Sequence, residues 1–137
     1  MERYESAIKV VKASDATIFD RLTDLAVIGQ ALPLQVVKDW EATADECHFT
    51  VDKVGRVGLK IEGKQPFALV KYTVTAQVPV GMSLFVQIKP APDDANESRI
   101  RLTITANIPF MLKAMVGGKL QELVDKLADA FATRLSF

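Results

Sequence analysis

The apolar residues of this chain change their spacing at Pro109, and this change limits what the chain can fold into. After Pro109 they recur every three or four residues, which is the period of an amphipathic α-helix. From residue 36 to residue 107 they alternate with polar residues, as in strands with one buried face. The only other apolar surface large enough to cover the helix is the inner face of such a sheet, so we expect the helix to lie across it. The apolar stripe of the helix consists of Met111, Met115, Leu120, Val124, Leu127, Phe131 and Leu135.

Six strands are predicted in this alternating region because turn-forming residues divide it at short intervals. The last is the clearest, since Ile100, Leu102 and Ile104 alternate with arginine and threonine. We expect residues 90–96, which are rich in proline and aspartate, to form an exposed hairpin loop before it. The predicted strands cover residues 36–42, 46–52, 56–62, 67–76, 83–89 and 98–107.

The first part of the chain predicts one more strand and two short helices. Residues 3–12 interleave apolar and polar side chains, with Tyr4, Ile8 and Val10 on one face. Ser14 is a suitable N-cap for a first helix, and a second short helix should stop near residues 29–33 at a glycine and a proline. The predicted fold is therefore α+β, with a seven-stranded antiparallel sheet, two short helices after strand one and a long C-terminal helix.

Composition and charge narrow the functional classes. The 137 residues fit one domain, and no linker-like segment divides them. Seventeen basic residues balance seventeen acidic ones, so we expect no nucleic-acid partner. Cys47 is the only cysteine and the first residues lack a signal peptide, which favours a reducing, cytoplasmic location. No apolar run approaches the ~20 residues that a membrane span needs.

Three segments complete the predicted order of elements: residues 14–25 (SDATIFDRLTDL), 107–116 (NIPFMLKAMV) and 120–128 (LQELVDKLA). With these segments, the chain resembles the helix-grip fold of the START-like, Bet v 1-like (SRPBCC) superfamily, which includes polyketide cyclase-like proteins. It is similar to small bacterial members of unassigned function. The resemblance implies a curved sheet and a cavity between that sheet and the C-terminal helix, which relatives use for lipids, sterols, polyketides and other apolar ligands.

The long methionine-containing stripe and this resemblance lead to a functional hypothesis. We expect a monomer or homodimer that binds a small apolar or amphipathic ligand, lipid-like or polyketide-like, without a metal or other cofactor. The expected pocket residues are Phe49, Leu59, Tyr72, Met82, Leu102, Met111, Met115 and Leu120.

Two alternatives remain open at the level of sequence. One is a cyclase or dehydratase that uses the same cavity, with Tyr72 as an acid, although the sequence contains no evident catalytic constellation. Tyr72 is otherwise a core tyrosine whose hydroxyl bonds to a backbone group. The other alternative is a partner-binding module without a ligand, which an exposed apolar patch would favour.

Two further signals have a structural explanation. Strand alternation turns His48, the only histidine, away from the apolar face and from Cys47, which argues against a metal site and favours a surface histidine. Residues 58–65 nearly match a phosphate-binding loop. However, Gln65 occupies the position of the required serine or threonine, and the segment alternates like a strand.

Overall fold

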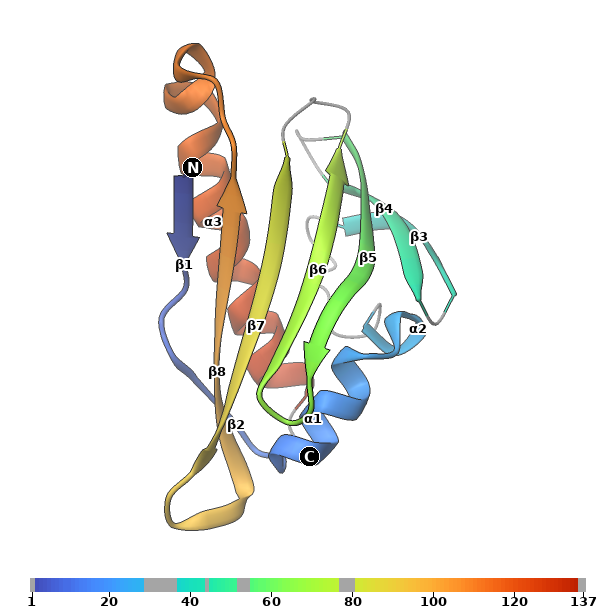
Figure 1. Cartoon of the computed structure of the whole chain (residues 1–137), viewed down its shortest axis with the longest axis vertical. Coiled ribbons are helices and arrows are strands. Elements are labelled where there is room, and N and C mark those ends of the chain that lie inside the picture. Colours follow the sequence, from blue (N-terminus) through green and yellow to red (C-terminus); the bar gives the residue numbers. More distant parts are fainter. Residues whose placement is uncertain (1, 29–36, 44, 52–54, 77–80, 136–137) are drawn as a thin grey trace.

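Eight antiparallel strands form one curved sheet in the order β1-β8-β7-β6-β5-β4-β3, with β2 also paired to β8 (Figure 1). The computed structural model describes residues 2–28, 37–43, 45–51, 55–76 and 81–135. The strands are β1 (Glu2–Glu5), β2 (Lys9–Val11), β3 (Val37–Ala42), β4 (Glu46–Val51), β5 (Gly55–Gln65), β6 (Leu69–Ala76), β7 (Met82–Ala91) and β8 (Asp94–Ala106). The helices are α1 (Asp15–Leu22), α2 (Leu25–Ile28), the 3-10 turn η2 (Phe110–Leu112) and α3 (Lys113–Arg134).

The predicted first strand is two strands, because its pairing with β8 shifts by one residue at Ser6. Glu5 pairs with Thr103, whereas Lys9 pairs with Ile100. The Ser6 backbone N–H donates to the Leu102 carbonyl, and the Ser6 hydroxyl accepts from the Leu102 N–H, so the side chain takes over one ladder bond. The sheet therefore has eight strands rather than seven, and the short helices follow the second strand.

The same shift overturns the prediction that Tyr4, Ile8 and Val10 share one face. A slip of one residue moves every later side chain of a strand to the other face of the sheet. Ile8 is 63% exposed and Val10 is 46% exposed, while Val11 is fully buried. Val10 pairs with Arg99, which the sequence correctly placed on the outer face. Ile8 and Val10 are therefore apolar residues of the outer surface.

The other strands lie close to their predicted positions, except at one hairpin. Strand β7 extends to Ala91 and β8 begins at Asp94, so the predicted loop over residues 90–96 is a tight turn. The Asp94 carboxylate accepts from the Asn96 N–H and supports this end of the strand. Residues 36 and 52, the predicted ends of two strands, and residues 29–33 lie outside the described residues.

The helices cover the inner face of the sheet in two groups (Figure 1). Ser14 caps α1 as predicted, accepting from the Thr17 N–H at 3.2 Å, and Ile18 and Leu22 are fully buried. Helix α1 packs on β6, β7 and β8, and the single turn α2 packs on β3 and β4. Helix α3 packs on β8, β2 and β1. The buried part of its stripe matches the prediction and consists of Leu120, Val124, Leu127, Phe131 and Leu135.

The start of the C-terminal helix differs from its prediction. Pro109 has extended backbone and precedes η2, so it is not a first residue of α3. Met111, in η2, is 88% exposed and does not belong to the buried stripe. Helix α3 is continuous across Gly117 and Gly118, and a Cβ atom at Gly117 would stand 3.2 Å from the Tyr4 hydroxyl. Gly117 therefore allows α3 to lie close to β1.

The two glycines of α3 form a matched pair for a stability test. We expect Gly118→Ala to raise the free energy of unfolding by about 0.5–1 kcal/mol, because alanine restricts the unfolded chain and nothing lies within 4 Å of the new Cβ. Gly117→Ala has the same helix propensity but crowds Tyr4, so its gain should be smaller or absent. Urea unfolding followed by circular dichroism measures both, and an equal gain at Gly117 would contradict the close packing.

Candidate functional site

The residues expected to line a pocket fall into three groups in the structure. Phe49, Leu59, Tyr72, Leu102 and Leu120 are buried on the inner side of the sheet or on the facing side of α3. Met82 is half-buried and packs against a small cluster that includes Leu120. Met111 is outside this interior, and the side chain of Met115 is outside the described residues. Six of the eight residues therefore lie on the inner side of the sheet or on the side of α3 that faces it.

The inner side of the sheet is not packed evenly. A large core surrounds Tyr72, Leu102 and Phe131, and a smaller separate cluster consists of Ala106, Ile108 and Leu120, with Tyr4 and Met82 against it. At the level of the smaller cluster, one row of neighbouring inner-face residues crosses the sheet. This inner row is Leu59, Val74, Met82 and Ala106.

The middle of this inner row is less buried than its ends. Leu59 and Ala106 are buried, whereas Val74 and Met82 are half-buried although they point inward. Among the described residues, α3 packs closely on β8, β2 and β1, at one side of the sheet. Met82 lies on β7, which is next to β8, and Val74 lies one strand farther from α3, on β6. The sequence did not single out Val74, because its partial exposure depends on where α3 lies.

Tyr72 is fully buried, and its hydroxyl donates a hydrogen bond to the Leu22 carbonyl. Burial, with a smaller effect from Cys47, holds the pKa of this phenol well above its ordinary value. The hydroxyl therefore stays protonated at neutral pH and connects the sheet to the end of α1. This is the core tyrosine bonded to a backbone group that the sequence left open as an alternative to an acid.

Cys47 is the second buried titratable group on the inner face. Burial raises the pKa of its thiol to about 11; the charge of Glu46 adds to this shift, and a backbone hydrogen bond with Leu59 opposes it. A thiolate is the nucleophilic form of cysteine, so a raised pKa makes this thiol inert. Cys47 therefore has the character of a core residue.

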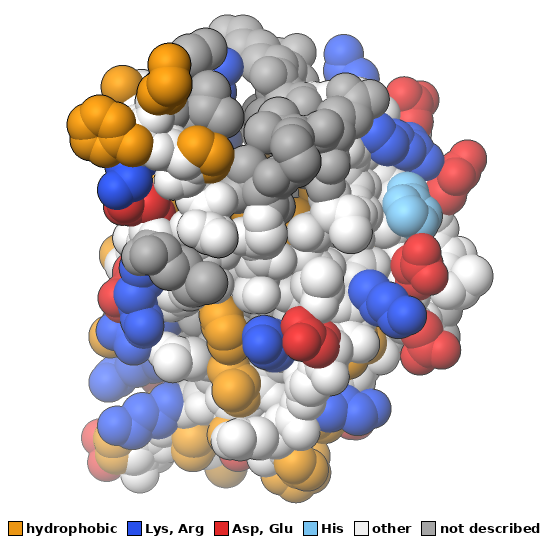
Figure 2. Space-filling view, turned by 45° about the horizontal axis from the view of Figure 1, so that its top comes forward, with side chains coloured by type: hydrophobic (Ala, Val, Ile, Leu, Met, Phe, Trp, Pro, Cys, Tyr) orange, Lys and Arg blue, Asp and Glu red, His pale blue; other side chains and the backbone are white. Residues whose placement is uncertain are grey.

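His48 is on the outer face, as predicted. Its Nε2 lies 2.9 Å from a Glu46 carboxylate oxygen, and its side chain is 44% exposed. Figure 2 shows this single histidine among acidic and basic side chains. A Cβ at Gly58 would stand 2.9 Å from the His48 ring, so this glycine makes room for the imidazole. Within the described residues, no group of three histidine, cysteine or acidic side chains is arranged to hold a metal ion.

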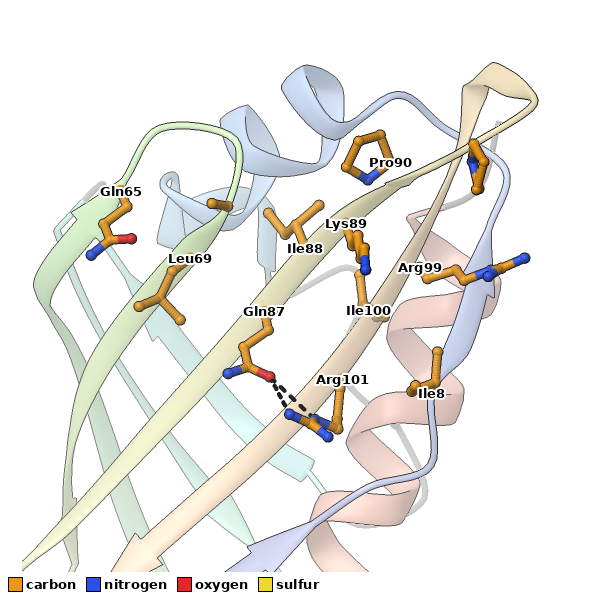
Figure 3. A pocket seen from close by; sticks show the side chains of 12 residues that line it. Ile8, Gln65, Leu69, Gln87, Ile88, Lys89, Pro90, Arg99, Ile100 and Arg101 are labelled. Carbon is orange, nitrogen blue, oxygen red and sulfur yellow. Dashed lines mark hydrogen bonds between the residues drawn. The ribbon is translucent and has the colours of Figure 1, made fainter.

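The outer face also contains a groove of about 550 Å³ near the β7–β8 hairpin (Figure 3). Strands β6, β7 and β8 form its base, and Ile8 borders it. Two donors of the Arg101 guanidinium bond to the Gln87 carbonyl oxygen at 2.8 and 3.1 Å, and Arg101 also lies 3.3 Å from Glu5. Sequence reasoning missed this groove, because the pairing of Lys89 with Arg99 depends on the turn and Ile8 was assigned to the wrong face.

An exposed apolar patch lies where η2 leads into α3. Phe110 is 86% exposed and Met111 is 88% exposed. Figure 2 shows exposed hydrophobic side chains gathered at this end of the molecule, at the upper left. This tip is the kind of surface that the partner-binding alternative requires.

Comparison with known proteins identifies the fold but not the family. No protein-family model matches this chain, and no curated protein matches its sequence. A conserved protein from Geobacillus kaustophilus has a TM-score of 0.71 and 12% identity over 98% of this chain and 95% of that one. A protein from Thermus thermophilus has a TM-score of 0.69 and 15% identity over 98% and 97%. The Aha1 dimer from Colwellia psychrerythraea has a TM-score of 0.61 and 18% identity over 97% and 98%.

These similarities show that the chain shares an α+β fold, an antiparallel sheet with a long C-terminal helix, with proteins of very different sequence. At such identities the fold carries no information about the ligand or the reaction. None of the helices in the described part of the chain is both long enough and apolar enough to cross a bilayer.

The Tyr72 hydroxyl is expected to contribute to stability. We expect Tyr72→Phe to lower the free energy of unfolding by ~1–3 kcal/mol, because the buried Leu22 carbonyl loses its donor. Tyr4→Phe is the matched control, since Tyr4 is only half-buried, and its effect should stay within ~0.5 kcal/mol. Urea unfolding of both variants measures the difference. Equal effects would show that the Tyr72 hydrogen bond does not stabilise the core.

The Cys47 thiol provides a test of burial through its pKa. At pH 8 about one thiol in a thousand is ionised when the pKa is about 11, so labelling by a thiol reagent should require unfolding. Because the folded-state pKa lies above the ordinary one, the free energy of unfolding should fall as the pH rises from about 9 to about 11. Ellman's reagent at increasing urea concentrations measures the labelling. Rapid labelling without urea would contradict a buried thiol.

Proposed function

We propose that this protein binds a small apolar or amphipathic molecule, lipid-like or polyketide-like, between the inner face of its sheet and α3. This is the use that START-like, Bet v 1-like proteins, which the sequence resembles, make of a helix-grip fold. The observation that carries the proposal is the partial exposure of Val74 and Met82 in the middle of an otherwise buried inner row. The ligand would cover these two side chains.

The chemistry of the inner row suits an apolar ligand. Burying apolar surface contributes roughly 25 cal/mol per Å², and Val74 and Met82 retain surface that a ligand can bury. Methionine is flexible and polarizable, so Met82 can adapt to ligands of different shape. Leu120 extends the same surface from the helix side. The site is therefore bordered by both the sheet and α3.

Binding is favoured over catalysis because the described interior has no acid–base pair poised for reaction. Its fully buried titratable groups are Cys47 and Tyr72, and burial keeps both protonated at neutral pH. The Tyr72 hydroxyl is already bonded to a backbone carbonyl. General acid–base catalysis requires groups whose pKa lies near the working pH.

The partner-binding alternative has one observation in its favour, the exposed tip formed by Phe110 and Met111. One similar structure is described as a dimer. The surface area of two side chains is far smaller than the ~800 Å² that each partner buries in a standard interface. The tip alone therefore does not account for a stable homodimer.

The inner site can be tested with one bulky substitution and its control on the opposite face. We expect Met82→Trp to weaken binding of the neutral fluorescent probe N-phenyl-1-naphthylamine at least tenfold, about 1.4 kcal/mol, because the indole fills the space beside Val74. Ser83→Trp places the same bulk on the outer face and should change the affinity less than twofold. Probe titration measures both, with circular dichroism to confirm folding. Absence of saturable binding, or equal loss in both variants, would refute the proposed site.

A further inference from the structure

We propose that the outer face of the sheet contains a second binding site, for a small amphipathic anion. The ligand has a carboxylate head and a short apolar body, and it occupies the groove between Ile8, Leu69 and the β7–β8 strands (Figure 3). This site is on the opposite side of the sheet from the inner row and does not depend on the function proposed above.

The first argument is a pair of like charges held side by side. Lys89 on β7 is the direct antiparallel partner of Arg99 on β8. Both side chains are exposed on the outer face and both line the groove. Like charges directly opposite each other destabilise a sheet, and an anion bound in the groove reduces this repulsion. The pair is therefore a local cost to folding that a bound carboxylate relieves.

The second argument is that these two cations have no acidic partner. No ion pair among the described residues includes Lys89 or Arg99. Glu97, two residues before Arg99 on β8, is bonded to Lys12, and Glu5 is bonded to Arg3 and Arg101. The groove lining itself contains no aspartate or glutamate. Its charge is therefore positive, although the chain as a whole is neutral.

The third argument comes from the next row of the same face, where Gln87 pairs with Arg101. The Gln87 carbonyl oxygen accepts both bonds from Arg101, so its amide nitrogen is left as a donor. Figure 3 shows this nitrogen on the side of the groove where Leu69 lies. Arg101 is held in place by these bonds and by Glu5. Figure 3 also shows the Arg99 side chain extending toward β2, so the donors of Gln87, Lys89 and Arg99 are spread along the groove and together make its surface cationic.

The groove also supplies apolar contact for the body of the ligand. Ile8 is 63% exposed at its border, and Leu69 and Pro90 line it. A volume of about 550 Å³ is within the range of small-molecule sites. Charge complementarity fixes the head of the ligand, and the apolar border selects a molecule with a hydrocarbon part.

The test is an NMR titration of the full ¹⁵N-labelled chain with sodium octanoate at pH 7, and with octan-1-ol as its neutral counterpart. We expect octanoate to shift the backbone amides of Gln87, Lys89, Arg99 and Arg101 saturably, with an affinity that falls as sodium chloride is raised. Octan-1-ol should leave these amides unchanged, because it lacks the charge that the cations recognise.

Three variants sharpen the result. Lys89→Gln and Arg99→Gln should each weaken octanoate binding at least fivefold. Lys60→Gln should change it less than twofold, because Lys60 is an exposed cation of β5 outside the groove, opposite Glu46. Lys89→Gln removes the like-charge pair, so its thermal midpoint should equal or exceed that of the wild type. Loss of binding therefore cannot be attributed to unfolding.

Several outcomes would overturn the second site. One is a set of octanoate shifts confined to the amides of Leu59, Val74 and Met82, which would place the anion in the inner site. Others are equal responses to octanoate and octan-1-ol, or affinities within twofold of wild type in both Lys89→Gln and Arg99→Gln. Cosedimentation with phosphatidylglycerol vesicles without any octanoate shift would assign the cations to a membrane surface instead. Because the Met82 test uses a neutral probe, either site can fail without the other.

Discussion

The one-residue shift in the pairing of β8 at Ser6 determines much of what surrounds it, on both faces of the sheet. The Ser6 hydroxyl replaces a backbone acceptor at the junction, so the ladder continues despite the extra residue. Beyond the shift, the Lys9 ammonium reaches Asp129 on α3 at 2.7 Å, so β2 helps β1 to position the helix. The same shift turns Ile8 and Val10 outward, and Ile8 borders the basic groove. One extra residue therefore contributes to the packing of α3 on the inner side and to the apolar border of the groove on the outer side.

The predictable and unpredictable parts of the structure differ in physical origin. The alternation in β8 and the stripe from Leu120 to Leu135 were read correctly, because burial of one face imposes a local period that the sequence must display. The predicted faces of Ile8 and Val10 were wrong, because the one-residue shift depends on pairing with β8, and the local sequence does not reveal that pairing. Met111 was assigned to the stripe on spacing alone, yet the chain enters α3 through a 3-10 turn that breaks the helical period.

The candidate sites were even harder to predict from the sequence than the fold. Tyr72 was recognised as a buried hydroxyl in need of a partner, but only the fold identifies the Leu22 carbonyl as that partner. The partial exposure of Met82 depends on where α3 crosses the sheet. Net neutrality argued against polyanions, and it concealed the local charge of Lys89 and Arg99. The net charge of a chain contains no information about which charged residues become neighbours in the fold.

The closely packed core and the two surfaces proposed for binding lie apart in this sheet. Val70 and Leu102 lie closer to the β7–β8 hairpin than the inner row does; they are fully buried and belong to a closely packed core. The local departures from good packing and charge placement are elsewhere: half-buried Met82 on the inner face, and the Lys89–Arg99 pair on the outer face. A sequence selected only for stability would fill the first and neutralise the second. A well-packed core can carry such costs, and the two departures coincide with the two surfaces proposed for binding.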